Sequence, residues 1–127
     1  MKKQISFFIR IIVAVILIQT LRFKFTAHPD SIYIFKSLGM EPYGRIGTGI
    51  LELVAGICLI IPKTAWAGAL LSITVLFGAV VSHITVLGIE INGDKGLLFF
   101  TALITFILSV IILYLQRRDI PFLKFFD

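Results

Sequence analysis

The sequence predicts an all-α fold, an integral membrane four-helix bundle with a short interfacial helix between its first and second spans. Hydrophobic residues make up 58% of the 127 residues and charged residues only 15%, whereas soluble domains are about 45–50% apolar and about 25% charged. The apolar residues form four runs, each near the ~20 residues that a helix needs to cross a roughly 30 Å hydrocarbon layer. The sequence lacks the alternating pattern of barrel strands, so we expect helices. One domain should cover residues 1–127.

We expect the spans at about residues 5–23, 44–61, 65–89 and 96–115. Basic residues precede the first run, as in a signal peptide, but no small-x-small cleavage site follows it, so we interpret it as a retained span. Pro62-Lys63-Thr64 leaves room only for a tight hairpin between the second and third spans. "EINGDKG", residues 90–96, is a polar turn before the fourth.

The loop between the first two spans contains its own helix signals. "PDSIYIFKSLG", residues 29–39, opens with Pro-Asp-Ser and closes with Gly, which are typical start and stop residues. Ile32, Phe35 and Leu38 recur at helical spacing. These features predict a short helix that lies at the interface or caps the bundle.

The distribution of basic residues predicts the orientation. On one side of a four-span protein they are Lys2, Lys3, Arg10, Lys63, Arg117, Arg118 and Lys124. The positive-inside rule therefore places both termini in the cytoplasm, and we expect a multi-pass protein of the bacterial inner membrane. The net charge of +5 lies at span ends rather than in a stripe with interleaved aromatics. The expected partner is thus the lipid bilayer and not nucleic acid.

Glu52 is the most informative residue, because it falls near the middle of the second span. A carboxylate at this depth costs several kcal/mol unless it is paired, protonated or solvated. It shares a helix stripe with Arg45, Gly49 and Gly56, and small residues around a polar one are typical of close helix contacts in lipid. Glu52 either locks helices together through a basic partner or forms the polar centre of a ligand cavity.

His83 is the only histidine within a predicted span. It lies in the third span, on a helix stripe with Ser72 and Leu76. It is either a hydrogen-bonded interface residue or a ligand-binding one. No second histidine or aspartate stands near it in the sequence, so a metal or haem site is not indicated and we predict no metal site.

Basic residues at the outer end of the first two spans form a second candidate site: Arg22, Lys24, His28 and Arg45. They anchor the protein at the interface or bind an anionic or quinone-like ligand at the mouth of the bundle. Arg10 is expected to snorkel to the cytoplasmic headgroups.

Other polar residues in the spans point to packing. Thr101, Thr105 and Ser109 lie near one face of the fourth span and should hydrogen-bond between helices. Cys58 is the lone cysteine and excludes a paired-cysteine redox enzyme. No nucleophile–base set or phosphate loop is visible in the sequence, so no catalytic residue is predicted.

Three stretches resemble the DoxX family of small bacterial membrane proteins: "KFTAHPDS" after the first span, "GMEPYGRIGTGILEL" opening the second, and "PKTAWAGA" entering the third. The resemblance implies a compact four-helix inner-membrane protein. Relatives include the small subunit of an archaeal thiosulfate:quinone oxidoreductase and membrane partners of enzymes that handle thiols and oxidative stress. The family's recurrent polar positions correspond to Lys24, Arg45 and Glu52.

Three functions follow as hypotheses. The first is a redox-associated membrane subunit, a partner of an oxidoreductase that presents a quinone, which makes the chain at most a subunit of an enzyme. The second is a small-molecule carrier, for which four spans are few unless the protein forms a homo-oligomer. The third is a structural or assembly protein in which Glu52 only joins helices.

Overall fold

The computed structural model describes residues 2–26, 28–41, 43–89, 91, 93, 95–117 and 120, with the side chains of residues 2 and 3 left out. Its helices are α1 (Lys2–Phe25), α2 (Pro29–Ser37), α3 (Tyr43–Ile60), the 3₁₀ turn η1 (Pro62–Thr64), α4 (Ala65–Ser82), the π-helical turn η2 (His83–Leu87) and α5 (Leu97–Leu115). The described residues are helical or in connecting turns, as the sequence predicts. Some residues of the sequence predictions lie outside this described part. They are Glu90, Asn92 and Asp94 of the predicted polar turn, and Arg118 and Lys124 among the basic residues that predict the orientation.

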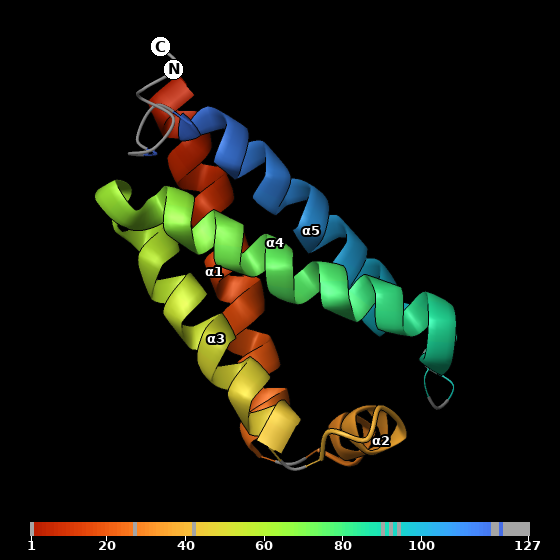
Figure 1. Ribbon diagram of the computed structural model, residues 1–127. Helices are drawn as coiled ribbons and strands as arrows, with labels where there is room; N and C mark the ends of the chain where they lie inside the picture. The colour runs from red at the N-terminus through yellow and green to blue at the C-terminus, as the bar shows by residue number, and fades with distance from the viewer. Residues whose placement is uncertain are drawn as a thin grey trace.

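The four long helices close into a bundle (Figure 1). α1 packs along α3, α3 along α4, α4 along α5, and α5 returns to α1. At the end of the bundle where α1 begins and α5 ends, Gln116 Nε2 donates a hydrogen bond of 2.5 Å to Ser6 Oγ. The predicted four-helix bundle is confirmed.

Four segments of the bundle are long and apolar enough to cross a membrane: Gln4–Phe25, Tyr43–Ile60, Pro62–Leu87 and Leu97–Leu115. The outer faces of these helices carry large apolar side chains; Phe8, Phe77 and Ile104 are 68%, 60% and 56% exposed. Such a surface suits hydrocarbon and not water. The chain is a multi-pass membrane protein.

The helix ends differ from the boundaries predicted from the sequence in two places. α1 continues to Phe25, so Lys24 stands on the last turn of the helix and not in the loop. The third span changes from α to π geometry at His83 and ends at Gly88, whose φ of +80° a residue with a Cβ rarely adopts. π-turns are rare and are frequently found at functional sites.

The apolar core occupies the half of the bundle nearer the α3–α4 hairpin. Its members are almost fully buried: Val13, Leu17, Ala55, Leu59, Ala69 and Ile112. Gly68 allows α4 to touch α3 here, because a Cβ at this position would lie 2.8 Å from both Ala55 O and Leu59 N.

Arg10 does not reach the headgroups, so that expectation was wrong. The residue is only 4% exposed, and its Nη1 donates a 2.9 Å hydrogen bond to Leu59 O. This carbonyl lies in the last turn of α3, where carbonyls have no partner within the helix and carry partial negative charge. The arginine therefore finds its acceptor inside the bundle.

α2 lies across the opposite end of the bundle and contacts α1, α3 and η2 (Figure 1). His28 caps it: His28 Nδ1 accepts a 3.1 Å hydrogen bond from Asp30 N, and Pro29 occupies the first turn. The predicted short helix between the first two spans is confirmed.

Candidate ligand-binding cavity

A cavity of about 400 Å³ lies between the four long helices, beneath α2. Most of its lining is apolar, including Ile16, Phe23, Ile34, Phe35, Leu38, Met40, Leu51, Val75, Leu76, Ala79, Leu87, Leu98 and Ala102. Polar side chains enter this wall at a few points, among them Thr20, Lys24, Glu52, His83 and Thr101. An apolar space of this size with a few converging polar groups is the usual form of a small-molecule site.

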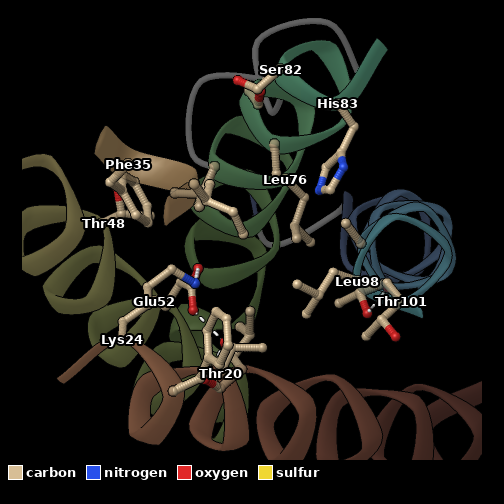
Figure 2. A pocket seen from close by; sticks show the side chains of 18 of the residues that line it. Thr20, Lys24, Phe35, Thr48, Glu52, Leu76, Ser82, His83, Leu98 and Thr101 are labelled. Atoms are coloured by element: carbon tan, nitrogen blue, oxygen red, sulfur yellow. Dashed lines mark hydrogen bonds and ion pairs between the residues drawn. The ribbon is translucent and has the colours of Figure 1, made fainter. Parts of the chain in front are cut away.

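Glu52 lines the cavity and is held by two side chains of α1 (Figure 2). Lys24 Nζ donates to Glu52 Oε1 at 2.8 Å, and Thr20 Oγ1 lies 2.5 Å from Glu52 Oε2. The side chains of Lys24 and Glu52 are only 12% and 4% exposed. Each carboxylate oxygen thus has one partner from α1, and Glu52 is an ion-paired group within an apolar wall.

Small residues on α3 allow this contact. Gly49 and Gly56 are both buried on the stripe that carries Glu52. A Cβ at Gly49 would lie 2.6 Å from Phe25 Cε1, so glycine is needed there, whereas a Cβ at Gly56 would make an ordinary contact of 3.9 Å with Ile18 Cγ1. α1 can therefore approach α3 closely enough for Lys24 to reach Glu52.

Arg45 shares the stripe with Glu52 but makes its contacts elsewhere. Its Nε donates to Glu41 Oε1 and Oε2 at 2.9 and 3.1 Å, and its Nη1 donates to the backbone carbonyl of Lys24. That carbonyl lies in the last turn of α1, where it lacks a helical partner. Arg45 therefore ties the end of α1 to α3 and holds the backbone of Lys24.

His83 lines the cavity from η2, on the side opposite the Lys24–Glu52 pair (Figure 2). It is 5% exposed. Its Nδ1 lies 2.9 Å from Gly88 O, and its ring packs edge-on against Phe99 with centroids 5.6 Å apart. The π-turn thus fixes one ring nitrogen on the backbone and leaves Nε2 for the cavity.

Three of the predicted site residues lie outside the cavity lining: Arg22, His28 and Arg45. Arg22 is exposed on the last turns of α1. His28 is exposed at the start of α2, where it caps that helix and packs on Phe23 with ring centroids 4.9 Å apart. The four basic residues at this end thus do not converge: Lys24 turns to Glu52, Arg45 to Glu41, and His28 to α2.

Thr20 and Glu41 are contacts of the site that sequence reasoning missed. A signal for Thr20 existed, since it stands four residues before Lys24 and therefore on the same face of the first span. Glu41 likewise stands four residues before Arg45, but it lies ahead of α3, outside the run that the apolar pattern marks.

The hydroxyls of α5 behave differently from the prediction. Ser109 bonds across the interface, with its Oγ 2.8 Å from Ser72 Oγ. Thr101 and Thr105 instead donate at 2.7 Å to carbonyls one turn earlier in α5, those of Leu97 and Thr101. A threonine in a helix commonly bonds back in this way, which satisfies its hydroxyl without a neighbour.

The chemistry that this arrangement supports is binding and hydrogen bonding. Within the part of the chain that the structure describes, no three histidine, cysteine or acidic side chains gather as a metal site would require. Cys58 is half-buried on α3, away from the lining of the cavity. The cavity offers an ammonium and a carboxylate at one side and an imidazole at the other.

Comparison with known proteins gives a family match: the model of the DoxX family matches residues 5–85, which include most of α1, all of α2 to α4 and the ionisable cavity residues Lys24, Glu52 and His83. No curated protein and no solved structure matches the chain. The match covers more than half of the chain, and it agrees with the three sequence stretches and the four-helix membrane fold. The chain is a member of the DoxX family.

Proposed function

We propose that this protein is a redox-associated subunit of the bacterial inner membrane that holds a quinone in the cavity and works with an oxidoreductase. The observation that carries the proposal is the buried Lys24–Glu52 pair at the wall of an apolar cavity of about 400 Å³. Ionisable groups at this depth are rare, and they mark ligand or proton sites in membrane proteins.

A quinone head group matches this lining in shape and polarity. Its flat ring suits the apolar side chains between the two polar sides of the cavity, such as Leu76 and Leu98. Its two oxygens lie at opposite ends of the ring, as the Lys24–Glu52 pair and His83 lie on opposite sides of the space (Figure 2). Few groups are needed for such a ligand, because polar contacts orient it while the apolar wall supplies most of the burial.

The orientation that we propose keeps both termini in the cytoplasm. Lys63 at the hairpin and Arg117 at the end of α5 support it, since both lie at the end of the bundle where α1 begins. The cavity and α2 then belong to the outer half of the membrane, and a partner enzyme would approach from that side. Cysteine-accessibility labelling of Lys63→Cys and Tyr33→Cys from each side of the membrane tests the orientation; labelling of Lys63→Cys from outside would reverse it.

Photo-crosslinking tests the ligand. Membranes containing the full chain are irradiated with an azido-benzoquinone, and the labelled peptides are identified by mass spectrometry. Label should appear on cavity-lining segments of α1, α3 and α4. Thr101→Phe, which places a ring in the cavity, should remove it, while Ile104→Phe on the lipid face of the same helix should not. Equal labelling of both variants would rule out the cavity as the quinone site.

The partner is tested separately. A tagged chain, purified in mild detergent from cells grown under aerobic conditions, should bring an oxidoreductase with it in defined stoichiometry. The matched control is the same preparation with α2 disturbed by Phe35→Asp, since Phe35 is buried in the helix that covers the cavity. If the folded chain is purified without an oxidoreductase from both preparations, the proposal that it is a subunit of such an enzyme is wrong.

A second function is favoured by one contact. Lys24 and Thr20 come from α1 and Glu52 from α3, so the same three residues would serve a purely structural protein by joining these helices. Under that alternative, Glu52→Gln lowers thermal stability and leaves quinone labelling unchanged. Under the main proposal, it also lowers the labelling of cavity peptides.

A further inference from the structure

We infer, resting on the proposed quinone site, that the cavity binds the hydroxyl-bearing quinol in preference to the quinone, and that His83 makes this selection. The two forms have the same ring and differ in their hydrogen-bonding groups. A quinone carbonyl only accepts hydrogen bonds, whereas a quinol hydroxyl donates one as well. The polarity of the groups in the cavity wall therefore decides between them.

His83 presents an acceptor to the cavity. Its Nδ1 lies 2.9 Å from the carbonyl oxygen of Gly88. A carbonyl oxygen cannot donate, so Nδ1 carries the proton and Nε2 of the neutral ring holds a lone pair. Burial and the edge-on contact with Phe99 hold the ring in this position.

The opposite side of the cavity serves either form. Glu52 only accepts, and the single hydroxyl proton of Thr20 is already placed between Glu52 Oε2 and Leu17 O, at 2.5 and 2.8 Å. Lys24 gives one of its three protons to Glu52 Oε1 and so retains donors. A ligand carbonyl here can accept from Lys24, and a ligand hydroxyl can accept from Lys24, donate to Glu52, or do both.

The two redox forms therefore differ in fit at His83. A quinol donates one hydroxyl to His83 Nε2, while its other hydroxyl meets the Lys24–Glu52 pair. A quinone that is bound to Lys24 turns its second carbonyl toward the Nε2 lone pair, and two acceptors then face each other without a proton. A buried acceptor left unpaired weakens binding by about tenfold or more.

The histidine tautomers provide the first test. In the full chain labelled with ¹⁵N-histidine, His83 should show a protonated Nδ1, and His28 should show the opposite tautomer because its Nδ1 accepts from Asp30 N. The two histidines of the sequence thus act as controls for each other. A His83 ring with its proton on Nε2 would overturn the inference.

The second test compares three probes by calorimetry on the detergent-purified chain under argon: tetramethyl-1,4-benzoquinone, its hydroquinone, and the dimethyl ether of that hydroquinone. The hydroquinone should bind about tenfold more tightly than the other two, because it alone carries hydroxyl donors. His83→Phe keeps the aromatic ring against Phe99 and should remove the difference. Thr85→Ala, on the same π-turn but outside the cavity lining and with its hydroxyl bonded to the Val81 carbonyl, should retain it.

The outcomes separate this inference from the function on which it rests. Equal or tighter binding of the quinone by the wild-type chain overturns the selection and leaves the quinone site standing. Binding of none of the three probes by protein that retains its melting transition overturns both. Equal binding of the hydroquinone and its dimethyl ether also overturns the selection, because shape and not hydroxyl donation would then govern affinity. These comparisons need no variant, so a misfolded His83→Phe does not decide the result.

Discussion

The two halves of this bundle are built from the same four helices but packed in different ways. At the α3–α4 hairpin, Gly68 on α4 sits against α3, where a Cβ would lie 2.8 Å from backbone atoms. Ten residues later on α4, Gly78 lines the cavity, and a Cβ there would meet nothing within 4 Å. One half is closely packed, and the other contains a partly open cavity of about 400 Å³.

The difference separates helix association from the cavity. In lipid, close packing of small residues and short hydrogen bonds is the main source of helix association. The packed half supplies this association through Gly68, Ala55 and Ala69, which lets the other half keep a cavity with an ion pair in its wall. A buried ion pair is weak evidence for stability. Its presence in the hollow half therefore favours a role in binding.

Breaking the ion pair should have the largest effect. Lys24→Met leaves the Glu52 carboxylate buried without its ammonium partner. We expect the free energy of unfolding in detergent to fall by about 3 kcal/mol. The double variant Lys24→Met with Glu52→Leu should recover most of this loss, because no charge is left buried and the Thr20 hydroxyl still bonds to Leu17 O. Both quantities are measured by equilibrium unfolding in a mixed-detergent titration.

The double variant also separates stability from function. It should be folded and yet fail to bind a quinone probe. A double variant that binds as the wild type does would show that the pair only joins α1 to α3.

Filling the two glycine positions compares the halves directly. Gly68→Leu forces α4 away from the backbone of α3, and we expect a loss of about 2–3 kcal/mol. Gly78→Leu places the same side chain in open space, so stability should be unchanged or higher while probe binding falls. The melting temperatures of both variants in one detergent check this. Similar losses at the two positions would mean that the cavity does not exist as described.

Removing the cap of α2 should have a smaller effect that is confined to the hollow half. His28→Ala loses the acceptor for Asp30 N, and such a cap contributes about 1 kcal/mol. Hydrogen exchange of the α2 amides should accelerate about fivefold while exchange in α3 and α4 stays constant. His28→Asn supplies another capping acceptor and should restore protection. Faster exchange throughout the bundle would show that α2 is not a separable cover.

The architecture could be predicted from the sequence because its cause is local. Runs of apolar residues, the Pro62 hairpin and the helix signals at Pro29 each act within a few residues, and the structure agrees with them. The burial of Glu52 on a glycine-lined stripe was also predictable, since helical periodicity alone places Gly49 and Gly56 beside it.

The partners of the polar groups could not be predicted in the same way. Arg45 and Lys24 are both basic and both near Glu52 along the bundle, and only the extension of α1 to Phe25 decides that Lys24 reaches the carboxylate. Arg10 finds a carbonyl 49 residues away. His83 faces the cavity because of a π-turn that no residue pattern announces. Such pairings depend on helix register and tilt, which single-sequence periodicity does not contain.

The smallest effect concerns the serine pair that joins α4 to α5 in the packed half. Ser72 Oγ and Ser109 Oγ are 2.8 Å apart and almost fully buried, and Ser109 also donates to Thr105 O, so Ser72 is the donor across the interface. A double-mutant cycle with Ser72→Ala and Ser109→Ala should give a coupling of about 0.6 kcal/mol, as for other hydrogen bonds between membrane helices. The matched cycle pairs Ser72→Ala with Thr101→Ala, whose hydroxyl bonds within α5, and should give no coupling. Coupling in the second cycle would mean that the hollow half transmits strain to the packed one, and the division between them would not hold.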